Sequence, residues 1–576
     1  MKIKGFYGKI TITDIYNIEE TDMQQLMGRA QDKEFWAYVR DAQCYKPLIE
    51  RLKKEYDANM ATGDLLNLKY SEFKLFWTTG NRTIYEKQFG IRRARANLCT
   101  ILSLIYPEEQ RYLDELMDTV YAICDEYSWC LPAHHGKLED NDNARIDLTA
   151  STTAAQLAEI YTVLEDRLEP LIKNRIKAEI DRRIVATFCP RDHYWWERGT
   201  MNWTAVCVGS VGRALMLMRP DIVNEAFIER LNASMDSFLT GFDSKGICFE
   251  GAAYWSYGFG FFVTYAEMVR RYTDGRVDFF KREKVKNVAT FFQKMFLSGN
   301  KGVSFSDGGK LLQYNVYLLH FLKSEYPDDI LVYKPEFGYW NFASIRDYTW
   351  YCEEYAANPA SDMASYELYA DEAQWMVKKT NAYGFAAKGG NNNEFHNHND
   401  VGSFIFAKDG DHVFTDPGGG VYTRQYFSAD TRYLCVECSS RGHSVPIIGG
   451  EVQKFGKQYA ASDAKYEDGV FSLEMAGAYA VEGINSVKRS FAMSEDSVTV
   501  TDSFDCGDMS IIDRVVTRIE PAVSEGCVRA GAGELTFDPE LCSVTVGSEL
   551  DSRSNTIWFI DLVPINGAKT VSYTMR

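Results

Sequence analysis

Two histidines and an aspartate occupy alternate positions in one short stretch of the sequence, NNNEFHNHNDVGSF, at residues 391–404. They are His396, His398 and Asp400. Alternate side chains of an extended strand point to the same face, so the spacing predicts that all three share one face. Imidazole and carboxylate groups can hold a metal ion or move protons. Because the chain has only eight histidines, the pattern favours an enzyme.

Two residues downstream could complete a metal site with this segment. Asp416 lies in TDPGGG and His443 lies in SSRGHSVP. The dipeptide at residues 409–410, Asp-Gly, lies between FIFAK and HVFTD and predicts a tight hairpin that carries Asp416 back beside the histidines. Two imidazoles and a carboxylate suit zinc, while one histidine remains for other chemistry. The alternative is that each residue is an ordinary hydrogen-bonded loop residue.

A second candidate constellation is EGAAYWSYG at residues 250–258. Glu250, Tyr254 and Tyr257 fall at positions i, i+4 and i+7, which predicts that they line one face of a helix. A tyrosine in a polar cleft can accept and donate a proton when nearby cations lower its pKa. The alternative is core packing, which is the usual role of aromatic residues at helical spacing.

Further candidates could contact an acidic sugar. Asn202 stands where a polar, aromatic loop meets an apolar helix; its amide could stabilise charge on a carboxyl group, or it could be a helix N-cap. The segments FGIRRARANL and SWCLPAHH supply cations and aromatic platforms, among them Arg95, Trp129 and His135. The alternative for the arginines of the first segment is a solvated helix face.

Composition and charge exclude several classes of protein. The formal charge of −18 argues against binding nucleic acid or an anionic membrane through bulk charge, and no run of about 18 apolar residues appears. The first residues lack a secretory leader, which predicts a cytoplasmic location. The 13 cysteines are scattered without a disulfide framework, which suits a reducing compartment. Cys435 and Cys438, in CVEC, are only a weak metal or redox signal. The sequence allows a homo-oligomer without requiring one.

The apolar pattern divides the chain into two parts. From about residue 20 to about 365 the apolar residues recur mostly at helical spacing, which predicts a bundle or toroid of helical hairpins. Beyond about residue 375, short alternating runs predict an antiparallel β-sandwich. We therefore expect a multidomain α+β protein, with a helical domain at 1–370 and a β-domain at 371–576. The absence of a Ser/Gly/Pro-rich linker predicts a close interface between them.

Taken in order, these segments resemble the heparinase II/III family of polysaccharide lyases. The resemblance covers most of the chain and is most specific at HNHNDVGSF with TDPGG, and at EGAAYWSYG. It implies an (α/α) toroid followed by an antiparallel β-sandwich, with the active site between the two. It also implies β-elimination of a uronate-containing polysaccharide, most often a glycosaminoglycan, to leave a 4,5-unsaturated uronate end.

The resemblance also implies roles for individual residues. His396 corresponds to the catalytic histidine, and the catalytic tyrosine lies in EGAAYWSYG, with Tyr254 as first choice and Tyr257 as second. Asn202 corresponds to an asparagine that neutralises the uronate carboxylate. The implied structural zinc has His398, Asp416 and His443 as ligands, although serine follows His443 where many relatives have asparagine. The candidate substrate contacts are Arg95, Trp129, His135, Trp203 and Glu250.

Three other functions are compatible with the same residues. The first is an alginate or oligoalginate lyase, which needs the same chemistry. The second is a glycoside hydrolase, for which Glu250 and Asp400 could supply the required pair of carboxylates. The third is a non-catalytic glycan-binding protein that keeps the fold and the zinc. Of these, the hydrolase leaves the histidine and tyrosine set without a task.

Overall fold

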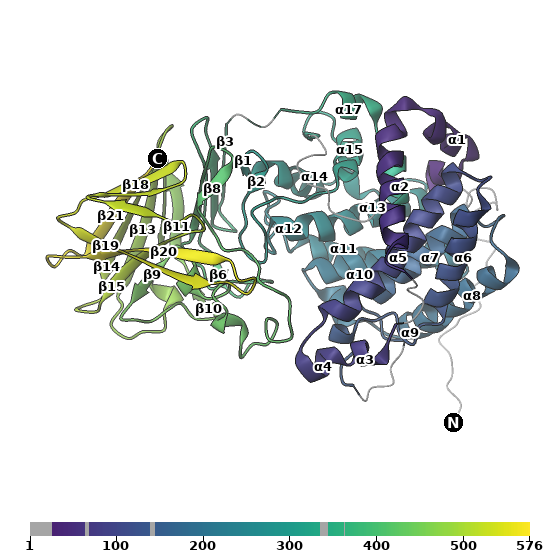
Figure 1. Ribbon diagram of the computed structural model, residues 1–576, viewed down its shortest axis with the longest axis horizontal. Helices are drawn as coiled ribbons and strands as arrows, with labels where there is room; N and C mark the ends of the chain where they lie inside the picture. Colours follow the sequence, from purple (N-terminus) through teal and green to yellow (C-terminus); the bar gives the residue numbers. More distant parts are fainter. Residues whose placement is uncertain (1–25, 64–67, 139–143, 334–343, 362, 364) are drawn as a thin grey trace.

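The computed structural model describes residues 26–63, 68–138, 144–333, 344–361, 363 and 365–576. Helices dominate the first part of the chain and antiparallel strands form the second, so the predicted fold class is confirmed (Figure 1). The change occurs between the last helix, α17 (Glu353–Ala357), and the strand β3 (Tyr366–Ala370). The domain limits at residues 370 and 371 stay a prediction.

The helical part is an α/α toroid in which α7 and α10 form the interior. These two helices are buried on nearly all sides and pack against each other, whereas α6 and α11 are amphipathic and cover the outside. The longer helices are α1 (Lys33–Asp41), α2 (Lys46–Met60), α5 (Thr83–Ile105), α6 (Gln110–Cys124), α7 (Leu148–Val163), α8 (Pro170–Ile180), α10 (Asn202–Met218), α11 (Glu225–Leu239), α13 (Gly260–Tyr272), α14 (Glu283–Phe291) and α15 (Val316–Glu325). The shorter helices are α3 (Tyr70–Phe73), α4 (Leu75–Thr79), α9 (Ala186–Phe188), α12 (Ala252–Tyr254) and α16 (Ile345–Thr349).

The strands of the second part form three larger antiparallel sheets. A five-stranded sheet has the order β3-β4-β5-β7-β8, an eight-stranded sheet the order β11-β12-β13-β14-β21-β18-β17-β16, and a four-stranded sheet the order β19-β20-β15-β9. Short strands β1 (Phe296–Ser298) and β2 (Lys301–Gly302) form a separate hairpin. The other strands are β4 (Trp375–Lys379), β5 (Gly384–Lys388), β6 (Asn391–Asn392), β7 (Phe404–Lys408), β8 (Asp411–Phe414), β9 (Pro446–Ile448), β10 (Gly456–Ala460), β11 (Ser462–Glu467), β12 (Val470–Glu474), β13 (Ser486–Met493), β14 (Val498–Asp505), β15 (Ile511–Thr517), β16 (Ala522–Ser524), β17 (Cys527–Ala530), β18 (Gly533–Phe537), β19 (Cys542–Leu550), β20 (Thr556–Pro564) and β21 (Thr570–Met575).

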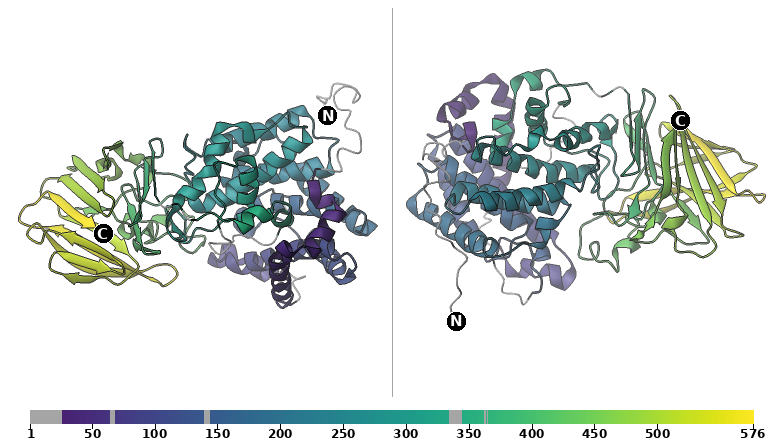
Figure 2. Two further views of the ribbon diagram at one scale, coloured as in Figure 1. Left: turned by 90° about the horizontal axis from the view of Figure 1, so that it is seen from above. Right: turned by 180° about the vertical axis from the view of Figure 1, so that it is seen from behind.

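The five-stranded sheet is the layer that joins the two parts (Figures 1 and 2). Alternate residues of its strands enter different cores. Trp375, Val377 and Ile405 belong to the helical core, whereas Met376 and Phe404 belong to the core of the β-domain. Because both faces of this sheet are buried, its strands are apolar on both sides, as in FIFAK. The predicted close interface is therefore present.

The hairpin predicted at Asp409 and Gly410 is confirmed. Strands β7 and β8 pair antiparallel on either side of it, and both turn residues have positive φ, 51° and 84°. This conformation matches the twist of the flanking strands and favours Asp-Gly. Among the described residues, no helix is both long enough and apolar enough to cross a membrane.

Candidate active site

The histidine segment is a loop between β6 and β7 and not the extended strand that its spacing suggested. His396 has a φ of 58°, which turns the chain at that point. The side chains of His396 and His398 nevertheless converge on one carboxylate, that of Asp307. Asp400 does not join them, because its Oδ1 atom binds Lys388 Nζ at 2.7 Å in a buried ion pair. The predicted common face of all three residues was wrong.

Asp307, which sequence reasoning missed, is the centre of the site. It lies between β2 and α15 in the helical part and is reached by donors from the β-domain. Burial alone would raise its pKa, but hydrogen bonds from His396 and His398 and the charge of Arg432 hold the pKa well below its usual range. Five side chains donate to the carboxylate: His396 Nδ1 (2.7 Å) and Tyr422 Oη (3.2 Å) to Oδ2, and His398 Nε2 (3.0 Å), Arg432 (3.0 Å) and Tyr426 Oη to Oδ1.

The sequence around Asp307 carries one signal that could have drawn notice. The letters SFSDGG interrupt the helical pattern with turn residues. Glycines on the facing loop make the close approach possible, since a Cβ at Gly418 would lie 2.3 Å from the carbonyl oxygen of Gly308, and one at Gly419 would lie 2.8 Å from that of Asp307. The sequence gives no sign that these two segments meet, because 110 residues lie between Asp307 and Gly418, the first glycine of the run.

Tyr254 is the tyrosine that faces the catalytic candidate His396. The two rings are stacked with centroids 4.0 Å apart and an interplanar angle of 18°. The Tyr254 hydroxyl is hydrogen-bonded to Tyr422, whose hydroxyl donates to Asp307. Burial, together with the neighbouring Tyr422 and the negative charge of Asp307, raises the pKa of Tyr254 well above its ordinary value. Tyr254 is therefore a protonated phenol at neutral pH.

Tyr257 does not face His396. The helix begins later than the residue spacing predicted, and its winding changes before Tyr257. Gly251, with a φ of 96°, precedes α12, so Glu250 is outside the helix. A π-helical turn at Trp255–Phe259 then changes the angular phase. Tyr257 packs on Phe261 at 5.3 Å and lines a cavity of about 390 Å³ inside the toroid. The predicted single face for Glu250, Tyr254 and Tyr257 was wrong.

Asn202 and Glu250 form a buried pair beside His396. Asn202 Nδ2 donates to Glu250 Oε1 at 2.7 Å, and the Asn202 backbone N–H donates to Oε2 at 2.6 Å. The same Oε1 atom lies 3.9 Å from His396 Nε2. Burial raises the pKa of Glu250, and His396 and Asn202 only partly oppose the rise. The N-cap of α10 is Met201, so Asn202 is not the N-cap that the alternative interpretation required.

Aromatic side chains flank this pair and the histidine. Trp203 is half-buried, with His134 at 4.8 Å and the exposed Trp195 at 5.1 Å between ring centroids. On the other flank, Phe427 of the β-domain lies 6.2 Å from His396 and beneath the Arg82 guanidinium at 5.8 Å. Phe427 was not predicted, because nothing in its local sequence relates it to His396.

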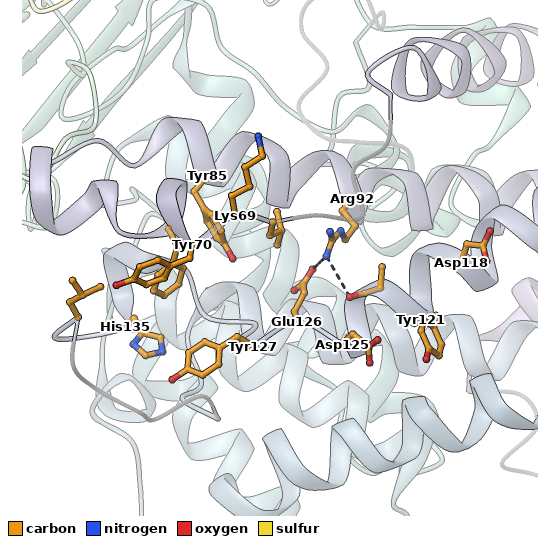
Figure 3. Close-up of a pocket in the computed structure, with 14 residues that line it drawn as sticks. Lys69, Tyr70, Tyr85, Arg92, Asp118, Tyr121, Asp125, Glu126, Tyr127 and His135 are labelled. Carbon is orange, nitrogen blue, oxygen red and sulfur yellow. Dashed lines mark hydrogen bonds and ion pairs between the residues drawn. The ribbon is translucent and has the colours of Figure 1, made fainter.

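Three predicted substrate contacts, at Trp129, Arg95 and His135, are buried away from the Asn202–Glu250 pair. Trp129 is 1% exposed, and its indole N–H donates to the Ile123 carbonyl at 2.9 Å. Arg95 is also buried and binds the Asn59 side chain and Glu115, both at 2.9 Å, so it is not on a solvated face. His135 is buried in the wall of a separate cavity of about 690 Å³ in the helical part (Figure 3). Arg95 lies in α5, whereas Trp129 and His135 lie in the connection that follows α6. The substrate contact predicted for His135 stays a prediction, because this residue lines a cavity.

The three predicted metal ligands come together. One ligand atom each of His398, Asp416 and His443 lies within 4.8 Å of the others, and all three side chains are buried. Each histidine has one nitrogen on an acceptor outside the set, since His398 Nε2 donates to Asp307 and His443 Nε2 donates to the Glu437 carbonyl at 2.8 Å. Within the set, His443 Nδ1 lies 3.0 Å from Asp416 Oδ2. Such contacts orient metal-binding histidines. Among the described residues, the buried His398 Nδ1 has no hydrogen-bond partner, so this donor set fits a metal ion.

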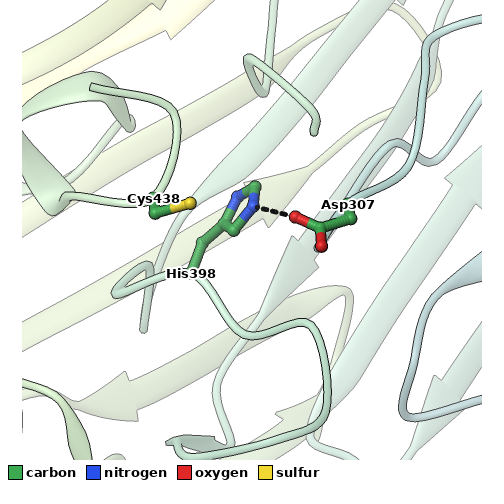
Figure 4. A group of neighbouring side chains, drawn as sticks. All are labelled: Asp307, His398 and Cys438. Carbon is green, nitrogen blue, oxygen red and sulfur yellow. Dashed lines mark hydrogen bonds and ion pairs between the residues drawn. The ribbon is translucent and has the colours of Figure 1, made fainter. Parts of the chain in front are cut away.

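Cys438 is a neighbour of this set. Its thiol, the His398 ring and the Asp307 carboxylate also offer ligand atoms within 4.8 Å of one another, and Figure 4 shows His398 between the other two. Burial raises the pKa of Cys438 to about 12, although the positive charge of Arg432 opposes the rise. Cys435 is only half-buried. The CVEC motif therefore directs one cysteine toward the histidines and leaves the other outside.

Comparisons with known proteins identify the fold. No protein-family profile and no curated protein sequence matches the chain. Solved structures do match it. The chain has a heparinase-type fold. Heparan sulfate lyase HepC from Pedobacter heparinus is similar with a TM-score of 0.60 and 12% identity, over 96% of this chain and 86% of that one. A heparinase III structure gives 0.60 and 12% over 97% and 92%. Chondroitin AC lyase from Streptomyces coelicolor A3 gives 0.54 and 11% over 94% and 82%.

In this heparinase-type toroid, several helices begin at the site. Arg82, which packs on Phe427, immediately precedes α5, and Asn202 is the first residue of α10. Asp147, the N-cap of α7, binds His134, which in turn packs on Trp203. Helix N-termini carry partial positive charge and attract anions. At α7 and α10 these N-termini already hold carboxylates of the chain, Asp147 and Glu250.

Proposed function

We propose that this protein is a lyase that cleaves uronate-containing polysaccharides or oligosaccharides by β-elimination, with glycosaminoglycans as the first substrates to test. The observation that carries the proposal is the stacked pair of His396 and Tyr254, with both side chains linked to the Asp307 carboxylate. The fold supports it, because the similar structures are those of a heparan sulfate lyase, a heparinase III and a chondroitin AC lyase.

Asn202 and Glu250 would receive the uronate carboxylate. The C5 proton of a uronate is weakly acidic, and its loss places negative charge on the carboxylate, which hydrogen-bond donors stabilise. Asn202 Nδ2 is such a donor, although it is occupied by Glu250 in the free protein. The raised pKa of Glu250 favours its neutral form, which can donate a hydrogen bond to a carboxylate instead of repelling it.

His396 and Tyr254 would move the protons. The ionised Asp307 only accepts hydrogen bonds, so His396 Nδ1 carries the proton and Nε2 is free to act as a base toward C5. Tyr254 holds its proton because its pKa is raised, which suits an acid that protonates the leaving O4. The high pKa disfavours the alternative in which a tyrosinate at Tyr254 performs both transfers.

We further propose that His398, Asp416 and His443 hold a structural zinc ion. A bound zinc ion would supply charge and fixed coordination, and no proton transfer is assigned to it. The three side chains are buried, and the contacts that orient both histidines are already present. Their role in this chain is to hold the loop from which His396 projects.

The structure favours a lyase over a glycoside hydrolase. A hydrolase needs two carboxylates that flank the scissile bond. Asp400 is fully buried and paired with Lys388, so it cannot serve with Glu250. The alginate alternative uses the same residues and is separated from the glycosaminoglycan proposal only by substrate.

An ultraviolet absorbance assay with purified zinc-loaded protein tests this function. Heparan sulfate, chondroitin, hyaluronan and alginate would each be incubated with wild type and with His396→Ala. A lyase produces a conjugated unsaturated uronate, so absorbance should rise with at least one glycosaminoglycan and not with the variant. A rise with alginate alone would transfer the proposal to that polymer. New reducing ends without absorbance would indicate a hydrolase.

A further inference from the structure

We propose that Asp307 is a positioning residue whose two carboxylate oxygens tie the orientation of His396 to the metal site at His398, Asp416 and His443. This inference rests on the proposed zinc site and lyase reaction. It goes beyond them because it assigns to one aspartate of the helical part a link between metal binding and the catalytic histidine.

The two oxygens of Asp307 serve different groups. Oδ2 accepts hydrogen bonds from His396 and from Tyr422, which is in turn bonded to Tyr254. Thus both proposed proton-transfer residues depend on this one oxygen. The other oxygen, Oδ1, accepts from three side chains: His398, Tyr426 and Arg432.

The carboxylate has little freedom to move between these groups. Asp307 is followed by Gly308, whose carbonyl accepts from the Gly419 backbone N–H at 2.9 Å, so the two loops are bonded through their backbones as well. A hydrogen bond to the second nitrogen of a metal-bound histidine fixes the ring, and the ring equally fixes its acceptor. A metal ion that holds His398 would therefore hold Asp307, and Asp307 would hold His396.

Substitution by asparagine separates the two functions of Asp307. An amide has one acceptor oxygen and one donor nitrogen. The oxygen should take the place of Oδ1, where three donors meet, and the amide nitrogen should then face His396 Nδ1 and Tyr422 without accepting from either. Asp307→Asn should therefore keep the metal site and lose the support of His396. Asp307→Ala should lose both.

Zinc affinity and steady-state kinetics are the first measurements. For Asp307→Asn we expect zinc affinity, measured by competition with a chromogenic chelator, within about threefold of wild type, and kcat lower by about 10- to 100-fold with KM nearly unchanged. For Asp307→Ala we expect zinc affinity to fall by about 10- to 100-fold as well. The control is Asp243→Asn, a buried aspartate of the helical part that accepts from the backbone N–H groups of Lys245 and Ile247.

A readout independent of activity is the imidazole N–H signal of His396. The chain has eight histidines, so selective ¹⁵N labelling of histidine is practicable, and His396→Ala assigns the signal. We expect a slowly exchanging Nδ1–H resonance in the zinc-loaded protein. It should disappear in Asp307→Asn, and it should broaden when zinc is removed from wild type or when His398 is replaced by alanine.

Two results would overturn the proposal. One is an His396 N–H signal that is unchanged by zinc removal, because the metal would then have no link to His396. The other is an Asp307→Asn protein that keeps its kcat and the signal. If no polymer is cleaved, the proposed function fails, but zinc affinity and the N–H signal still decide whether Asp307 links the two sites.

Discussion

Two buried charged side chains, Arg489 and Asp307, differ in how accessible their hydrogen-bond partners are. Arg489, in the β-domain, donates to Asp502, Asp513 and two carbonyl oxygens, and every one of these groups is fully buried. Asp307 accepts a similar number of hydrogen bonds, but the side chain of one of its donors, His396, is 17% exposed to solvent. The Nε2 atom of that histidine faces Glu250 at 3.9 Å, outside hydrogen-bond range.

The difference separates a structural centre from a candidate catalytic one. At Arg489 the partners are all supplied by β-domain strands and loops, and the network ends within the core. At Asp307 the acceptor comes from the helical part and the donors come from the β-domain, so the centre exists only when both are assembled. Substitutions at the Arg489 centre should therefore lower stability, and substitutions at the Asp307 centre should lower kcat.

The largest effect on turnover is expected for His396→Ala. Loss of a general base commonly costs about 10²- to 10⁴-fold in rate, and we expect kcat to fall within this range. Because His396 is partly exposed, the thermal midpoint should remain near that of wild type. Steady-state kinetics and differential scanning calorimetry would test the pair of expectations. A loss of stability as large as that expected at the Arg489 centre would contradict the distinction between the two centres.

Replacement of Arg489 by methionine should produce the opposite result. It would leave Asp502 and Asp513 buried without their countercharge, which typically costs about 3–5 kcal/mol in the free energy of unfolding. The fraction that remains folded should keep wild-type kcat. Urea unfolding combined with active-site titration would measure both quantities. A variant with normal stability and reduced kcat would show that the two centres are not distinct in function.

Within the helical part, Tyr254 and Tyr257 provide a sharper version of the same contrast. Tyr254→Phe removes the proposed acid beside His396 and should lower kcat by about 10²-fold. Tyr257→Phe alters a side chain on the wall of the toroid cavity and should leave kcat within about twofold. Each variant lacks one hydroxyl group of the wild type, and the two positions are three residues apart. Equal loss of activity in both would remove the assignment of Tyr254.

The smallest effect on activity is expected for Glu250→Gln, which should change how KM depends on pH. The raised pKa of Glu250 keeps it neutral at low pH; as the pH rises through that pKa, its ionisation should repel the uronate carboxylate and raise KM. Glutamine cannot ionise, so this rise in KM should disappear. At low pH, KM should change by roughly 2- to 10-fold, the value of one hydrogen bond. KM measured across the pH range would test this.

The stability of the wild type should also follow the Glu250 carboxyl group. A buried acid whose folded pKa is raised stabilises the folded state fully below the ordinary glutamate pKa. This contribution is lost as the pH rises through the raised value. Glu250→Gln should flatten this part of the stability curve. An unchanged curve in the variant would assign the effect to another group.

Much of the fold and part of the site could be predicted from local sequence. Helical and alternating apolar patterns predicted the two parts, and Asp409–Gly410 predicted the hairpin between β7 and β8. The residue types, together with the family resemblance, implied that His398, Asp416 and His443 form one set, and the structure brings the three side chains together. The predictions about the fold succeeded because hairpin geometry and apolar periodicity act over short stretches of chain.

Other features depended on packing between distant segments. The burial of Trp129 and Arg95 and the π-helical turn after Tyr254 follow from how helices pack, which residue spacing does not report. Asp307 is 89 residues from His396 and 125 residues from Arg432 along the chain. No periodic pattern connects them, so their hydrogen bonds could not have been predicted from one sequence.

The histidine segment itself illustrates this division. The residue types predicted metal binding, proton transfer or both for this segment, because few side chains can bind zinc or transfer protons near neutral pH. Only the family resemblance divided these roles between His396 and His398. Tertiary structure decided the orientation of each ring. It placed a carboxylate from the helical part between His396 and His398, and a buried, ionised carboxylate must collect hydrogen-bond donors from whatever segments surround it.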